Sequence, residues 1–112
     1  MIEKIVLDHL KSKVDVPVVL EIPPDPPEKF VLIQKTGSSV ENFLYSATLA
    51  LQSYAARKYE AAALNELVKS SMDALPASVD DVTKSKLNSD YDFTDVTSKR
   101  YRYQAVYDVV HY

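Results

Sequence analysis

The end of the chain, residues 100–112, alternates between two kinds of side chain. The first set is mostly apolar or aromatic and consists of Tyr101, Tyr103, Ala105, Tyr107 and Val109. The second set is more polar and includes Arg102, Gln104 and Asp108, with Val106 and Val110 among them. Successive side chains of a β-strand point to opposite faces of a sheet. The alternation therefore predicts a long, half-buried strand, and the fold must contain a sheet with one covered face.

The remaining elements follow from the spacing of apolar residues. Apolar side chains at helical spacing predict a short helix over residues 2–12 and a main helix over residues 57–75, which Pro76 ends. Alternating or β-branched stretches predict strands over residues 16–21, 29–35, 43–54, 84–92 and 100–112. The order α-β-β-β-α-β-β predicts one α+β domain over residues 1–112. We expect a single antiparallel or mixed sheet of about five strands, with both helices packed on one face.

Two connecting segments have distinctive compositions. Four of the six prolines lie between Pro23 and Pro27, and this segment is expected to be a stiff, extended connector between strands. It contains Pro-x-x-Pro twice but has no close basic residue, so a ligand for a proline-reading domain is the weaker interpretation. Residues 36–42 are polar and predict a loop, in which Gly37, the only glycine, is expected to adopt a backbone conformation that other residues avoid.

Composition excludes several classes of function. A single glycine rules out glycine-rich phosphate-binding loops, and the lack of cysteine rules out disulfides and thiolate chemistry. A net charge of −3 argues against a general affinity for nucleic-acid phosphates. The first ten residues do not resemble a signal peptide, and no apolar run approaches the roughly 20 residues that span a membrane. Synthesis in a cytoplasm, without a membrane partner, is therefore expected.

The titratable residues offer few candidates for catalysis or metal binding. His9 and His111 are the only histidines, and no motif supplies a nucleophile or an orienting carboxylate, so structural or surface roles are expected for both. Asp90, Asp92 and Asp95 form the densest acidic group and are weak candidates for a hard cation such as Ca²⁺ or Mg²⁺. The alternative is a charged strand edge that discourages aggregation. We predict no catalytic residue, no cofactor and no resident metal.

Aromatic residues indicate contact surfaces instead. The chain has eight tyrosines and no tryptophan, and tyrosine is enriched at protein interfaces. The strip around Lys99, Arg100 and Arg102 contains tyrosines that could stack on bases, but tyrosines in the core beside a solvent-exposed Arg102 are the better interpretation. The residues predicted to lie at interfaces are Gly37, Tyr45, Tyr54, Tyr101, Arg102 and Tyr112.

Two stretches carry a resemblance to a known family. Residues 102–112, Arg-Tyr-Gln-Ala-Val-Tyr-Asp-Val-Val-His-Tyr, follow residues 90–95, Asp-Tyr-Asp-Phe-Thr-Asp. Together with residues 43–55, Phe-Leu-Tyr-Ser-Ala-Thr-Leu-Ala-Leu-Gln-Ser-Tyr-Ala, and the helix after them, they resemble the tail-terminator or tail-completion proteins of long-tailed bacteriophages and prophages. The resemblance extends over most of the chain and consists of strand and helix patterns without a catalytic signature.

The resemblance implies a structural role. Such a protein caps the finished tail tube as a homo-oligomeric ring, usually a hexamer, stops tube polymerisation and offers a surface to the head-completion or connector protein. DNA would pass through the ring without specific binding, along an inner wall expected to be acidic. The location implied is the head-proximal end of the virion tail, after assembly in the host cytoplasm. Three alternatives remain open: a head–tail adaptor or stopper, a small enzyme using Asp90, Asp92 or His9, and a monomeric protein-binding module.

Overall fold

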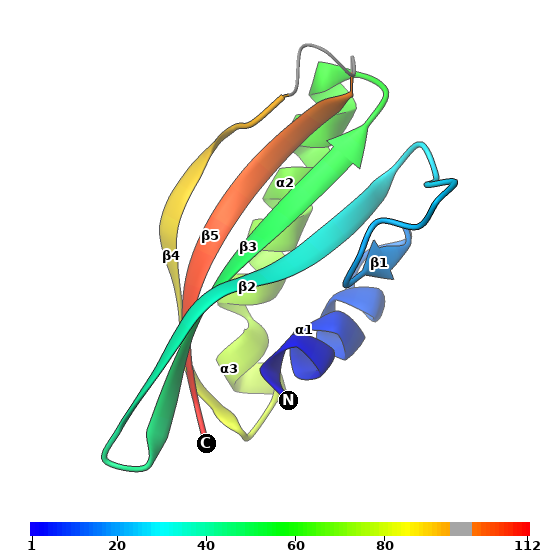
Figure 1. The fold of residues 1–112 in the computed structure, drawn as a ribbon. Helices are drawn as coiled ribbons and strands as arrows, with labels where there is room; N and C mark the ends of the chain where they lie inside the picture. Colours follow the sequence, from blue (N-terminus) through cyan, green and yellow to red (C-terminus); the bar gives the residue numbers. More distant parts are fainter. Residues whose placement is uncertain (95–99) are drawn as a thin grey trace.

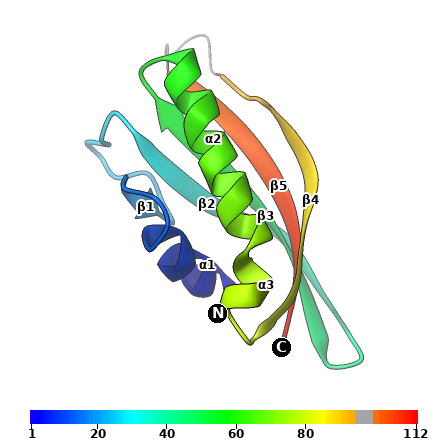
Figure 2. The same cartoon turned by 180° about the vertical axis from the view of Figure 1, so that it is seen from behind.

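The computed structural model of the protein describes residues 1–94 and 100–112. The chain forms one sheet with helices on a single face (Figures 1 and 2). The elements, in chain order, are α1 (Ile2–Lys11), β1 (Val18–Val19), β2 (Phe30–Glu41), β3 (Leu44–Ala55), α2 (Lys58–Asp73), α3 (Leu75–Ser78), β4 (Val82–Asp92) and β5 (Tyr101–His111).

The sheet has five strands in the order β1-β2-β3-β5-β4. β1 pairs in parallel with β2, and the other neighbours are antiparallel, so the sheet is mixed. The predicted α+β class, with five strands and both long helices on one face, is confirmed. Pro17 precedes β1 at the sheet edge, where a missing N–H costs no ladder bond, and its carbonyl accepts a hydrogen bond from Val31 N–H at 2.9 Å.

The core lies between the helices and the sheet. α1 and α2 lie on the face visible in Figure 2, and their buried side chains include Val6, Leu10, Val68 and Met72. The sheet contributes mainly the inward set of alternating residues, and its central members are Val31, Ile33, Leu49, Leu51, Ala105, Tyr107 and Val109. The period-two pattern of β5 thus faces the helices as the sequence predicts.

The predicted single helix over residues 57–75 is wrong at its end. α2 ends at Asp73, and a four-residue helix, α3, follows and contains Pro76 near its start. Proline lacks an N–H group and cannot continue a helix from inside, but it is tolerated in the first turn of a new one. The two helices therefore meet at Ala74, and Pro76 lies in the first turn of the second helix, where the sequence predicted the end of the main helix.

The predicted loop over residues 36–42 is also wrong. β2 continues to Glu41 and β3 begins at Leu44, so β2 and β3 form a long hairpin closed by only Asn42 and Phe43. Gly37 lies inside β2, next to a register shift between Lys35 and Gly37, and its φ angle is not positive. A Cβ atom added at Gly37 would meet nothing within 4 Å, so its conformation does not require glycine.

Candidate functional site

The tip of the β2–β3 hairpin carries exposed apolar side chains. Val40 of β2 pairs with Tyr45 of β3, and Tyr45 pairs with His111 of β5, so these three residues share one face of the sheet. The aromatic rings of Tyr45 and His111 are stacked, with centroids 5.6 Å apart. No helix covers this part of the sheet in Figure 1, and Val40 and Tyr45 are 61% and 49% exposed. An apolar group so placed is available to a partner.

Phe43 is the most exposed large apolar residue of the described chain, at 94%. It occupies the second position of the two-residue turn, with φ of 67°, after Asn42 with φ of 51°. Two positive φ angles define the turn type that suits a twisted hairpin, and glycine is strongly preferred at this second position. A bulky residue there is a backbone outlier, with a conformational cost of about 1–2 kcal/mol. The backbone at this turn therefore has a conformational free-energy cost at a residue whose aromatic side chain is exposed to water.

We call the surface formed by Val40, Phe43, Tyr45, His111 and Tyr112 the hairpin end. Tyr112 follows His111, is 67% exposed, and its N–H donates to Asp81 O at 2.9 Å. Three of the residues predicted at interfaces, Gly37, Tyr45 and Tyr112, belong to the hairpin or lie beside it. The hairpin end is therefore the candidate functional site.

A second aromatic group lies at the other end of the same three strands. Phe30 of β2 and Tyr54 of β3 are stacked, with centroids 4.5 Å apart and planes inclined by 6°. The Arg100 guanidinium lies 5.4 Å from the Phe30 centroid and donates to Pro27 O at 2.8 Å. The Arg102 guanidinium lies 4.4 Å from the centroid of Phe93. We call these five residues, Phe30, Tyr54, Phe93, Arg100 and Arg102, the arginine cluster, which lies on the sheet face away from the helices.

A chain of side-chain hydrogen bonds extends from the arginine cluster across three strands. Arg102 Nη1 donates to Tyr54 Oη at 3.0 Å, and Tyr54 Oη donates to Gln52 Oε1 at 2.9 Å. Gln52 Nε2 donates to Gln104 Oε1 at 2.7 Å, and Gln104 Nε2 donates to the hydroxyl of Tyr91. Gln52 and Gln104 are only 6% and 9% exposed, and each has its amide oxygen and nitrogen paired. This row of hydrogen bonds stabilises the otherwise open face of the sheet.

Three of the predicted interface residues, Tyr54, Tyr101 and Arg102, belong to this end of the sheet, and the surroundings of each differ from what the sequence predicted. Tyr54 is 4% exposed and its hydroxyl is paired on both sides, so it is a core residue and not an interface residue. Arg102 was expected in solvent, but it is half-buried and its Nε donates to Phe93 O at 2.6 Å. Tyr101 was expected in the core beside Tyr103 and is 37% exposed, so that expectation is wrong, and its place at an interface stays a prediction.

The acidic group is engaged by cationic and polar side chains. Lys69 Nζ lies 2.5 Å from one carboxylate oxygen of Asp90, and Asn65 Nδ2 donates to the other at 2.7 Å. The hydrogen bond to Asp90 raises the pKa of Lys69 above its usual value of 10.5. Asp90 therefore joins β4 to α2, and a cation there would have to displace Lys69.

Asp92 is held in a similar way. Its carboxylate accepts hydrogen bonds from the hydroxyl and the N–H of Thr94 and lies 3.5 Å from Lys58 Nζ, and these contacts lower its pKa below 3.8. The third cation candidate, Asp95, lies outside the described residues, as does Lys99 of the basic strip. In residues 1–94 and 100–112, no group of three His, Asp or Glu side chains could hold a metal ion.

The two histidines lie in different parts of the molecule. His9 is buried, and its Nε2 lies 2.7 Å from Ser71 O, which as a carbonyl oxygen must accept the hydrogen bond from a protonated ring nitrogen. This bond ties α1 to α2 and gives His9 a structural role, while His111 belongs to the hairpin end. Tyr107 donates to Asp73 Oδ1 at 2.9 Å beneath α2, and burial, followed by this carboxylate, raises the pKa of Tyr107 above its usual value.

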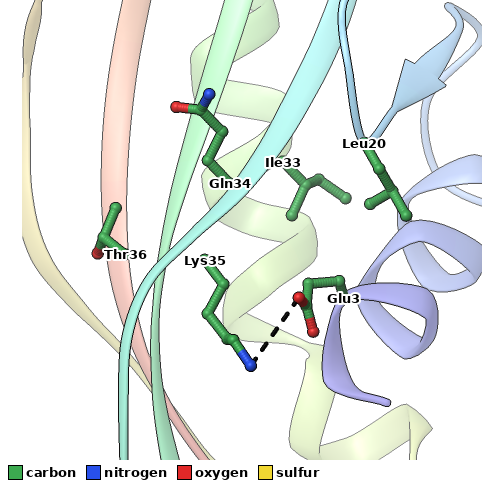
Figure 3. A pocket seen from close by; sticks show the side chains of 6 residues that line it. All are labelled: Glu3, Leu20, Ile33, Gln34, Lys35 and Thr36. Carbon is green, nitrogen blue, oxygen red and sulfur yellow. Dashed lines mark ion pairs between the residues drawn. The ribbon is translucent and has the colours of Figure 1, made fainter.

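Two open cavities lie along the hairpin. The first, of about 500 Å³, is lined by Glu3, Leu20, Ile33, Gln34, Lys35 and Thr36, and we call it the edge groove (Figure 3). The second, of about 230 Å³, is lined by Glu41, Asn42, Leu44, Ser46 and Val110. Neither cavity is lined by His9, Asp90 or Asp92, the residues of the enzyme alternative.

Comparison with protein-family models and with curated proteins finds no match to this chain. Among the described residues, no helix is both long and apolar enough to cross a membrane.

Sequence reasoning missed the most exposed residues of the site, Val40 and Phe43. Val40 was assigned to a polar loop, and Phe43 was assigned to the start of a strand. The available signal was Asn42, which tolerates positive φ angles and favours tight turns. A turn centred on Asn42 would have predicted two paired strands on either side of it and an aromatic residue at the tip.

Proposed function

We propose that this protein is a structural subunit that assembles with copies of itself, and that the hairpin end is one of its contact surfaces. Within that class, we propose that it is the tail terminator of a long-tailed bacteriophage, a ring that caps the tail tube. No chemical step is part of this proposal.

The position of Phe43 carries the proposal. A residue that is 94% exposed contributes little to the stability of its own monomer, and its positive φ angle adds a cost. A glycine at the same position would remove both the cost and the exposed aromatic side chain. A phenylalanine there is useful only if another molecule covers it, and aromatic side chains at the centre of a contact supply much of its binding energy.

The resemblance in residues 43–55 and 102–112 supports the finer part of the proposal. These segments form β3 and most of β5, the central pair of the sheet, and both reach the hairpin end. A cyclic assembly needs two different complementary surfaces on each subunit, and a projecting hairpin provides one of them. The tail-tube protein, the head-completion protein and DNA passing through the ring are the partners that this role requires.

Solution mass measured by light scattering after size exclusion tests self-association. We expect the wild-type protein to form a discrete multi-subunit species as its concentration rises from micromolar to millimolar. The Phe43→Gly variant should remain folded and require at least tenfold more protein to assemble. A wild-type protein that stays monomeric over this whole range would refute self-association and favour the monomeric binding module.

Purified phage tails and heads test the finer role. Binding to the ends of tails, with shorter or uniform tubes when the protein is present during polymerisation, is expected of a terminator. Binding to heads alone would reject the terminator and favour the adaptor or stopper. Electron microscopy of an assembled ring would also reveal its inner wall, and a wall lined by lysine or arginine would contradict the acidic lumen.

A further inference from the structure

The outer edge of β2 is covered over only a short length. On this edge β1 pairs with Val31 and Leu32, and from Ile33 to Glu41 no strand of the described residues lies beside it, since β3 pairs with the other edge of β2. Val31 N–H points towards β1, where Pro17 O accepts it. Because backbone groups alternate along a strand, those of Lys35 point to the same, uncovered edge. Such an edge can pair with an extended segment of another molecule.

The edge groove lies where β1 stops. Ile33 and Leu20 give it an apolar floor, and Lys35 and Glu3 stand at its rim, as Figure 3 shows. The Lys35 Nζ to Glu3 Oε2 distance is 4.0 Å, and the Lys35 side chain is 39% exposed. This ion pair is long and solvated, so it contributes little to stability and leaves Lys35 able to bind an additional carboxylate.

The hairpin end has the complementary features. Phe43 offers an exposed apolar side chain, and Glu41, two residues earlier in β2, is exposed and has no ion pair among the described residues. A hairpin end cannot reach its own groove, because the six residue steps from Lys35 to Glu41 span about 20 Å of strand. The hairpin end of one copy can therefore occupy only the groove of another copy.

We propose that the hairpin end of one copy occupies the edge groove of the next, with Phe43 over Leu20 and Ile33 and with Glu41 beside Lys35. This inference rests on the proposed self-association and specifies its two surfaces. The surfaces differ, so the contact is head to tail and either closes into a ring or continues as a filament. The opposite sheet edge, β4, is a poorer partner because Lys84, Lys86 and two register irregularities interrupt it.

Charge reversal tests this pairing of surfaces. Lys35→Glu places a carboxylate in the groove, and Glu41→Lys places an amine on the hairpin. Each variant alone should need at least tenfold more protein to assemble, because every contact then joins like charges. In an equimolar mixture the subunits can alternate, and every contact joins opposite charges again. Assembly should therefore return in the mixture, and each closed assembly should contain an even number of subunits.

Each outcome of this experiment is decisive. Lys84→Glu is the matched control on the other edge and should assemble like the wild type. If the wild type assembles but the mixture does not recover, the hairpin does not occupy the groove, although self-association still holds. A strict dimer in both the wild type and the mixture would indicate two-fold pairing of β2 edges and overturn the head-to-tail arrangement. A wild type that is monomeric at millimolar concentration would overturn both proposals together.

Discussion

The hairpin end and the arginine cluster lie at opposite ends of β2, β3 and β5 and are built from similar side chains, yet their surroundings differ. Each has a phenylalanine, a tyrosine and a nitrogen-bearing side chain stacked on an aromatic ring. At the arginine cluster, Arg100 and Arg102 cover the rings and every polar group named above has a partner. At the hairpin end nothing in the described chain covers Phe43.

This difference shows what marks a contact surface. Tyrosine content alone does not separate the two regions, because each contributes tyrosines to the total. The deciding property is whether the rest of the chain already covers the aromatic rings and pairs their polar atoms. An aromatic group that the chain covers stabilises the folded monomer, and an exposed aromatic group is available to stabilise a complex. Substitutions at the two regions, and one titration, test this distinction, and their expected effects on the folded monomer decrease from Phe30 to Asp92.

The two phenylalanines should respond very differently to truncation. Phe30→Ala removes a fully buried ring from beneath Arg100, and we expect the free energy of unfolding to fall by about 3–5 kcal/mol. Phe43→Ala removes a ring that is in water, and the change should stay within about 0.5 kcal/mol. Urea unfolding followed by circular dichroism measures both. Equal losses would mean that the hairpin end packs against the monomer and is not a free surface.

Removing the hydroxyl of Tyr54 should likewise lower the free energy of unfolding more than removing the hydroxyl of Tyr45. Tyr54→Phe leaves buried Gln52 Oε1 without the hydroxyl donor that it accepts from, and we expect a loss of about 1–3 kcal/mol. Tyr45→Phe is the matched control at the hairpin end and should be nearly neutral, because Tyr45 is 49% exposed and water can solvate it. The same unfolding experiment applies. A neutral Tyr54→Phe would show that water replaces the hydroxyl.

Phe43→Gly should separate stability from assembly. The variant places the preferred residue at a positive φ angle, and we expect the monomer to gain about 0.5–1 kcal/mol after the extra entropy of glycine in the unfolded chain is subtracted. Thermal and urea unfolding of dilute, monomeric protein give the change. A loss of stability would contradict both the backbone cost and the absence of a packing role for this side chain.

The smallest effect concerns the carboxylate beside the arginine cluster. The hydrogen bonds from Thr94, and then Lys58, lower the pKa of Asp92 below 3.8. Since the folded pKa lies below the unfolded one, the stabilisation from Asp92 is complete above about pH 3.8 and is lost as pH falls through the folded pKa. Carbon NMR of the Asp92 carboxylate should give a midpoint below 3.8, and Thr94→Ala should raise it. A midpoint at or above 3.8 would exclude these contacts in solution.

The sequence predicted the strands of the sheet better than it predicted where helices and strands end. Period-two alternation is set by backbone geometry, so β3, β5 and the helix-facing residues were accessible from the pattern alone. The ends of elements were harder, because Pro76 allowed a new helix after α2 and polar residues around Gly37 extended a strand. The polarity of residues 36–42 reflects a hairpin exposed on both faces, and a loop has the same composition.

The candidate site was predicted only in part for a related reason. Tyr45 and Tyr112 were assigned to interfaces on residue type, and Gly37 as part of a polar loop, and all three belong to the hairpin or lie beside it. Tyr54 and Arg102 were assigned on the same argument and are engaged inside the arginine cluster. Whether an aromatic side chain is covered depends on Arg100, Pro27 and Phe93, which are distant in sequence from Tyr54. Such pairings are not visible in a local pattern.

The chain of side-chain hydrogen bonds that begins at Arg102 and ends at Tyr91 has a further consequence for the register in which the strands pair. A shift of β5 against β3 by one residue would turn its apolar side chains to the wrong face, but a shift by two would keep every face unchanged. In that shifted pairing Gln52 would no longer lie opposite Gln104, and the hydrogen bond from Gln52 Nε2 to Gln104 Oε1 would be lost. The hydrogen bond between Gln52 and Gln104 therefore favours one register of β5 against β3. Hydrophobic side chains alone could not distinguish that register from one shifted by two residues.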